Sequence, residues 1–148
     1  MNFKFQISNF KFWMVALVGI ALSSCSLKEN EYQVSDLQGL WLEDNTEHYV
    51  RFTTDQSDEA GYLLGREWDL AEDVHEQDLI AQYERDHRPG NGWFKYWLKT
   101  NGDLMEFHYM DNDGAIIPKV YIVTTLTKTK LAYYEKDQKS NKFSFTKQ

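Results

Sequence analysis

Residues 92–109 read GWFKYWLKTNGDLMEFHY and give the clearest structural signal in the chain. Apolar and polar side chains alternate over residues 93–99 and again over residues 104–109, which is the period of a half-buried strand. Asn101 and Gly102 lie between the two halves, and this dipeptide is typical of tight hairpins because both residues tolerate positive φ. The stretch therefore predicts two antiparallel strands joined by a short turn.

Further strands are predicted on both sides of this hairpin. In all, eight candidate strands begin near Gly39, His48, Gly61, Gly92, Asp103, Val120, Lys130 and Asn141. Short turns join the last five, which indicates an antiparallel meander. Eight antiparallel strands close into a barrel whose interior is either filled or holds one small ligand. We therefore expect an all-β fold, an eight-stranded antiparallel up-and-down barrel with a long connection between strands 3 and 4.

That long connection, residues 69–91, shows no clean periodicity. A short amphipathic helix within residues 71–83 competes with a strand over residues 78–84. Pro89 and Gly90 then end whichever element precedes them. A connection of this length inside a compact domain is often functional or mobile, and we expect it to cap the mouth of the barrel or to distort the barrel.

The first 24 residues resemble a secretory signal. They carry two lysines and no acidic residue, and an apolar run covers residues 12–22. This run is well short of the roughly twenty residues that a membrane-spanning helix needs. The sequence predicts a signal peptide over residues 1–24, a lipidated cysteine with its tether over 25–36, and a barrel domain over 37–148.

The predicted lipidation concerns Cys25, the only cysteine of the chain. Residues 22–25, Leu-Ser-Ser-Cys, resemble a bacterial lipobox. This resemblance implies that a diacylglycerol is attached to the Cys25 sulfur, with acyl chains such as palmitate, and that the chain is cleaved before it. Two acyl chains anchor a protein stably, whereas one does not. We therefore expect an exported outer-membrane lipoprotein on the periplasmic or the cell-surface face.

The net charge of the chain limits the classes of partner that it can bind. The formal net charge is −7, and removal of Lys4 and Lys11 with the signal makes it −9. Binding to nucleic acid depends on neutralising phosphates with Lys and Arg, so no nucleic acid partner is expected. The four histidines are dispersed and match no metal-ligand spacing. We therefore predict no metal site and no cofactor.

Alternate side chains of a strand point to opposite faces, and this alternation indicates which residues line the barrel interior. Lys95 and Lys99 share one face of their strand, which places the opposite face in the interior. The same preference for apolar side chains, applied to the next strand, leaves Glu106 and His108 outside. The residues expected to line the interior or a ligand are Trp41, Phe52, Leu63, Phe94, Tyr96, Leu98, Met105, Phe107, Tyr109, Val123, Phe143 and Phe145.

Glu106 and His108 lie two residues apart on one strand face and, together with Glu67, are the residue types of acid–base chemistry. No nucleophile motif accompanies them, and nothing in the sequence brings Glu67 to the other two. We interpret Glu106 and His108 as the polar outer face of a strand. No catalytic residue is predicted, and the chain is not expected to be an enzyme.

Several motifs together resemble the small lipocalin-like lipoproteins of Bacteroidetes. They are the lipobox, Gly39-x-Trp41, the eight strands and the segment from Tyr121 to Leu131. The resemblance implies an up-and-down barrel and a small apolar ligand, and it transfers no catalytic residue. The first hypothesis is a lipid-anchored binding protein for such a ligand. The alternative is a filled barrel that binds another envelope protein through Trp93, Trp97 and residues 69–91.

Overall fold

The computed structural model describes residues 31–110 and 114–148 of the chain. They belong to one compact unit, Glu31–Gln148, while the predicted signal peptide and Cys25 lie outside the described residues. The described part contains helices α2 (Val34–Leu37) and α3 (Glu76–Asp86) and the 3-10 helix η1 (Leu70–Glu72). Its strands are β1 (Gly39–Glu43), β2 (His48–Gln56), β3 (Leu63–Asp69), β4 (Trp93–Leu98), β5 (Asp103–Tyr109), β6 (Ile116–Leu126), β7 (Lys130–Glu135) and β8 (Gln138–Lys147).

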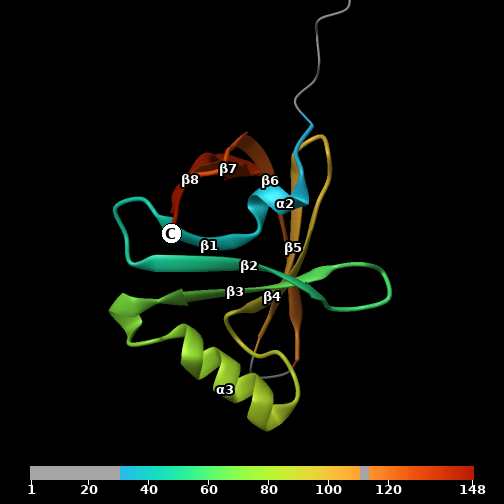
Figure 1. Ribbon diagram of the computed structural model, residues 1–148, viewed down its shortest axis with the longest axis vertical. Helices are drawn as coiled ribbons and strands as arrows, with labels where there is room; N and C mark the ends of the chain where they lie inside the picture. Colours follow the sequence, from blue (N-terminus) through green and yellow to red (C-terminus); the bar gives the residue numbers. More distant parts are fainter. Residues whose placement is uncertain (1–30, 111–113) are drawn as a thin grey trace, which may run out of the picture. The chain divides into compact units, whose positions relative to one another are not determined.

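The strands form a closed antiparallel barrel in chain order, as Figure 1 shows. Closure comes from β1, which pairs with β2 on one side and with β8 on the other. Each predicted strand start lies within four residues of the observed one. The expected fold, including the long connection between the third and fourth strands, is confirmed.

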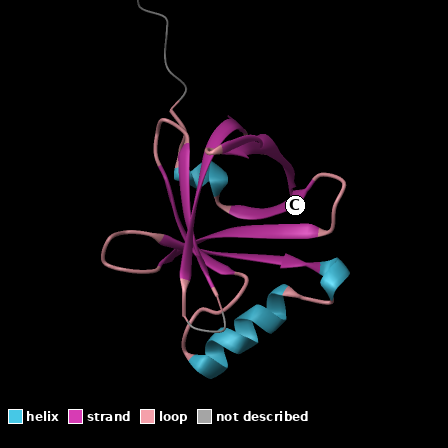
Figure 2. Cartoon of the chain, turned by 180° about the vertical axis from the view of Figure 1, so that it is seen from behind, coloured by secondary structure: helices cyan, strands magenta, loops and turns pink. Residues whose placement is uncertain are grey.

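Residues 31–36, which the sequence analysis assigned to the tether, are part of the folded unit. The backbone N–H of Tyr32 donates to the carbonyl of Thr100 at 3.0 Å. Leu37, at the end of α2, is fully buried in the barrel core, and Val34 packs against the same core. The helix therefore lies at one end of the barrel (Figure 2).

Large side chains fill most of the barrel interior. The largest fully buried residues are Trp41, Tyr96, Phe52, Phe94, Phe145, Leu37, Leu104 and Leu131. Gly65 makes room for this packing, because a Cβ there would lie 2.3 Å from the ring of Phe94. A dense aromatic core of this kind is the main source of stability in a small barrel.

The long connection forms a helix, so the helical alternative of the sequence analysis is the right one. Trp68, Leu79 and Trp93 form a second apolar cluster between α3 and the outer face of the barrel. Glu76, at the start of α3, accepts hydrogen bonds from Arg51 and Arg66. The helix thus lies beside β3 on the outer wall (Figure 1) and does not cap the barrel. Trp93 is 3% exposed and is no contact surface.

The turn between β4 and β5 is one residue longer than an Asn-Gly hairpin turn. Lys99 N–H donates to Asp103 O at 2.9 Å, so three residues, 100–102, form the loop. Gly102 has a φ of 95°, whereas Asn101 is not among the residues with positive φ. As a result Leu98 faces Leu104. A shift of one residue moves every side chain of a strand to the other face of the sheet.

Candidate functional site: a buried chain of histidines and carboxylates

The register of β5 places polar side chains inside the barrel. Phe94 faces His108 and Tyr96 faces Glu106 across β4 and β5, and directly opposed residues point to the same side of a sheet. Glu106 is only 3% exposed and His108 only 5%. The interpretation of these two residues as an outer polar face is therefore wrong.

Met105, Phe107 and Tyr109 consequently lie on the outer side of β5, and their predicted inward placement is wrong. Phe107 packs edge-on against Tyr62, with 5.3 Å between the ring centroids. Tyr109 packs against the apolar cluster beneath α3. The preference for burying apolar rather than charged side chains failed at this strand because the buried charges are paired with each other.

Four side chains from three strands form a continuous chain, called here the His–Glu chain: His48, Glu67, His108 and Glu106. His108 Nε2 lies 2.7 Å from Glu106 Oε2, and His108 Nδ1 lies 3.1 Å from Glu67 Oε1. The other oxygen of Glu67 lies 3.7 Å from His48 Nε2. Both imidazole nitrogens of His108 thus face carboxylates, an arrangement that favours the imidazolium as a double donor.

Protonation of the His–Glu chain follows from this geometry. Burial disfavours the imidazolium of His108, but hydrogen bonds to Glu106 and Glu67 outweigh it and raise the pKa of His108 to about 9. Burial also opposes ionisation of Glu67, yet the neighbouring imidazoles of His108 and His48 hold its pKa well below the usual range. The carboxylate of Glu67, 3.7 Å away, raises the pKa of His48. At neutral pH the centre of the chain is a carboxylate–imidazolium ion pair.

Stability should therefore decline on the alkaline side. A pKa of His108 raised from 6.5 to about 9 gives a stabilisation that is complete below pH 6.5 and is lost as pH rises through 9. The lowered pKa of Glu67 acts in the opposite direction, and its contribution is lost only as pH falls below about 4.5. We expect the free energy of unfolding, measured by urea titration, to fall by a few kcal/mol from pH 6 to pH 10.

His108→Gln should remove most of this decline, because glutamine does not titrate, whereas the exposed His75→Gln variant should keep it. An unchanged pH profile in the His108 variant would show that other groups cause the decline. His48 is the nearest such group, since its imidazole lies 3.7 Å from Glu67 and its pKa is raised as well.

Glu106 is incompletely satisfied. Its Oε1 atom is buried and has no hydrogen-bond partner among the described residues. Lys119 lies directly opposite Glu106 in the register of β5 and β6, but the ion pairs formed by Glu106 and Glu67 within residues 31–110 and 114–148 are those to the two histidines. A buried charged oxygen without a partner is rare and calls for an explanation.

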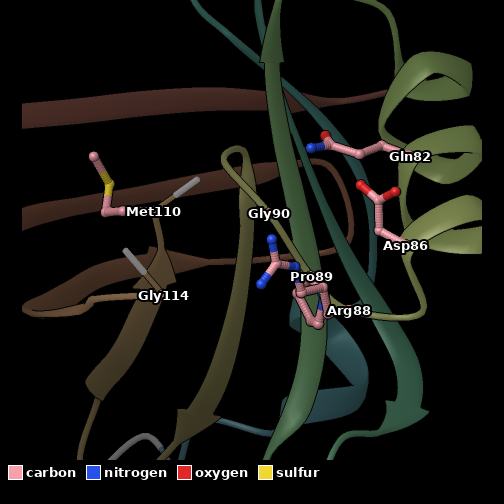
Figure 3. A pocket seen from close by; sticks show the side chains of 7 residues that line it. All are labelled: Gln82, Asp86, Arg88, Pro89, Gly90, Met110 and Gly114. Carbon is pink, nitrogen blue, oxygen red and sulfur yellow. The ribbon is translucent and has the colours of Figure 1, made fainter. Parts of the chain in front are cut away.

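Two pockets lie at the end of the barrel where β3 and β5 finish. The first has a volume of about 430 Å³, and His48 and Glu67 of the His–Glu chain line it together with Asp69, Glu72 and Asp78. The second, of about 280 Å³, lies where Asp86, Arg88 and Pro89 approach Met110 (Figure 3). Only the first reaches the His–Glu chain, so it offers the access from solvent.

The remaining residues expected to line the interior do so in the structure. They belong to the core cluster or pack against it: Trp41, Phe52, Leu63, Phe94, Tyr96, Leu98, Val123, Phe143 and Phe145. Most of them are buried against one another, which leaves little of this set for contact with a ligand. Phe143 is only partly buried, and it packs against Tyr121 and Tyr133.

No group of three or more His, Cys, Asp or Glu side chains among the described residues is placed to hold a metal ion. None of the helices formed by residues 31–110 and 114–148 is long and apolar enough to cross a membrane. His108 offers no free nitrogen to a substrate, because a carboxylate occupies each one. The arrangement is thus suited to holding a charged group rather than to shuttling protons.

Sequence reasoning missed His48, Glu67, Glu106 and His108 as a group. The available signal was the pairing of β4 with β5, since Phe94 and Tyr96 were correctly placed inside and residues opposite them must also point inward. To use that signal, one must know that the turn has three residues, 100–102. The Asn101-Gly102 dipeptide indicates a turn of two residues instead. Glu67 and His48 come from strands distant in sequence and carried no local signal.

Comparison of the chain with protein-family models, with curated proteins and with solved structures found no match.

Proposed function

We propose that the chain is a lipid-anchored envelope protein of lipocalin-like fold that binds a small molecule with an apolar body. The observation that carries the proposal is the presence of ionised groups within an apolar barrel interior. Aromatic and aliphatic side chains fill most of the interior, and two members of the His–Glu chain, His48 and Glu67, line a pocket of about 430 Å³ that opens beside α3. Interiors that combine apolar walls with a few converging polar groups are typical of small-molecule sites.

Binding is favoured over catalysis for a specific reason. A general base must be unprotonated near neutral pH, but the raised pKa of His108, about 9, keeps that imidazole charged. Apolar surface beside the His–Glu chain comes from Tyr121, which lies two positions along β6 from the residue opposite Glu106, and from its ring neighbours Tyr133 and Phe143. The expected ligand therefore has both an apolar part and a polar part.

The anchor is proposed from the sequence around Cys25. The test is intact-mass spectrometry of the full-length protein after expression in a bacterium. Wild-type protein should begin at Cys25, carry the added mass of the acyl chains and sediment with membranes. Cys25→Ser should lose both the added mass and the sedimentation, whereas the neighbouring Ser26→Ala should keep them. Wild-type protein of unmodified mass in the soluble fraction would contradict the anchor.

Ligand binding is tested separately, by native mass spectrometry of the full-length protein released gently from the envelope in which it was made. We expect a reproducible extra mass that disappears on denaturation. Glu47→Gln, a change at an exposed residue, should retain the extra mass. Protein that never carries extra mass and whose tryptophan fluorescence is unchanged by added fatty acids, alcohols or amines would contradict binding.

A second function, binding of an envelope protein, is favoured by one observation. The side chain of Trp97 is 48% exposed on the outer face of β4, and Tyr62 packs edge-on against it. Exposed tryptophan is enriched in interfaces. Cross-linking in intact cells through a photoreactive residue at position 97 should yield one discrete product if this surface is a contact, and a crosslinker at exposed Gln77 should not.

A further inference from the structure

The unpartnered oxygen of Glu106 is the most informative feature of the interior. Oε2 of the same carboxylate accepts a hydrogen bond from His108, whereas Oε1 has no partner among the described residues. The residue is 3% exposed, so water does not reach this oxygen freely. Burial of a charged acceptor without a donor is unfavourable. A donor that arrives with a ligand removes this penalty.

Charge around Glu106 sets the sign of that donor. Glu67 and Glu106 share the one imidazolium of His108. Glu43 lies on the same inward face of β1 as Trp41, and Glu135 faces Tyr121 across β6 and β7. Asp69, Glu72 and Asp78 line the pocket of about 430 Å³ and add further negative charge there. Lys119 offsets only part of this excess, so a cation is attracted and an anion is repelled.

Three aromatic rings stand beside these carboxylates. The ring centroids of Tyr121 and Tyr133 are 4.7 Å apart, and Phe143 lies 5.9 Å from the first and 5.5 Å from the second. Tyr121 lies opposite Leu104 and Lys119 lies opposite Glu106, so Tyr121 and Glu106 are diagonal neighbours on the inward face of β5 and β6. Burial, and next to it the negative charge of Glu106, raises the pKa of Tyr121 and of Tyr133. Ring faces next to carboxylates are a recurrent environment for organic ammonium groups.

We propose that the ligand is an amine: an ammonium group, primary or substituted, carried on an apolar body. Its N–H donates to Glu106 Oε1, and its apolar body packs against Tyr121, Tyr133 and Phe143. This inference rests on the proposed binding function and names the ligand's chemical class. An organic cation fits better than a metal ion, because no group of three ligating side chains exists in the described part of the chain.

The test compares three probes that share one apolar body and differ in charge: 2-phenylethylamine, 2-phenylethanol and phenylacetate. Each is titrated calorimetrically into the full-length protein held in nanodiscs of zwitterionic lipid, with empty nanodiscs as the blank. We expect the amine to bind at least tenfold more tightly than the alcohol, and the acid to bind most weakly.

The outcomes separate the two proposals. Equal affinity for amine and alcohol overturns the amine inference and leaves small-molecule binding intact. Tighter binding of the acid also overturns the inference, and it would mean that Lys119 and the histidines provide the recognition. Binding of no probe, at concentrations up to millimolar, overturns the inference and counts against the proposed function as well.

A variant then assigns the effect to Glu106. Glu106→Gln keeps the size of the side chain and an oxygen acceptor but removes the charge, and it should reduce the preference for the amine over the alcohol to less than threefold. Glu47→Gln, an equal change of charge at an exposed position, should keep the preference. A Glu106→Gln protein that folds and retains a tenfold preference overturns the assignment. If it does not fold, the probe comparison on wild-type protein decides alone.

Discussion

Replacing His108 with alanine is expected to lower the free energy of unfolding by about 3–5 kcal/mol, the loss typical of removing one partner from a buried ion pair. The imidazolium is the donor that both Glu106 and Glu67 share. Its removal leaves the two carboxylates close together, with Glu106 shielded from water. Urea titration at pH 7, followed by circular dichroism, measures the loss.

The matched control for this prediction is His75→Ala. His75 is exposed at the N-cap of α3, and its side chain makes no capping hydrogen bond, so the change should stay within about 0.5 kcal/mol of wild type. Replacing Glu106 and His108 together with leucine should recover part of the stability, because the buried carboxylate of Glu106 is removed while Glu67 keeps only His48, 3.7 Å away. A loss below 1 kcal/mol in His108→Ala would mean that the pair contributes little.

The second large effect is expected at Trp41. Its side chain is fully buried in the core, and its indole N–H donates to the carbonyl of Leu37 at 2.6 Å. Trp41→Ala should lower the free energy of unfolding by about 3–5 kcal/mol through lost packing and the cavity left behind. Trp41→Phe should lose less, since it keeps a ring but gives up the hydrogen bond. Urea titration of both variants is the measurement.

Trp97→Ala is the control of the same residue type. Because the side chain of Trp97 is 48% exposed, its removal should lower the free energy of unfolding by no more than about 1 kcal/mol. Similar losses for Trp41→Ala and Trp97→Ala would contradict the view that packing in the barrel core dominates stability.

The strands could be predicted from the sequence because each is marked by a pattern within a few consecutive residues. Alternation marks each strand, and Lys95 showed which face of β4 is outside. The helix after β3 stayed ambiguous because its apolar face is short: Leu79 is the only buried residue of α3. Its stability depends on contacts with Trp68 and Trp93, which no local pattern displays.

The candidate site was harder to predict, for two physical reasons. One is register, since the three-residue loop at 100–102 reverses the faces that a two-residue turn would give to β5. The other is compensation. A buried glutamate is unfavourable by itself, and Glu106 becomes tolerable only beside His108, which in turn needs Glu67 from another strand. The pairing is visible only once the barrel is closed.

The pairing of β1 with β8 has a consequence for the folding kinetics. It joins the two ends of the folded unit, where Asp44 accepts hydrogen bonds from Ser144 at 2.6 Å and from Thr146 at 2.7 Å. Closing a loop of about a hundred residues is entropically slow, and barrels dominated by such distant contacts fold in milliseconds to seconds. Until β1 and β8 pair, the edges of these two strands are open and can join strands of other molecules. Closure of the barrel is therefore the step at which folding competes with aggregation.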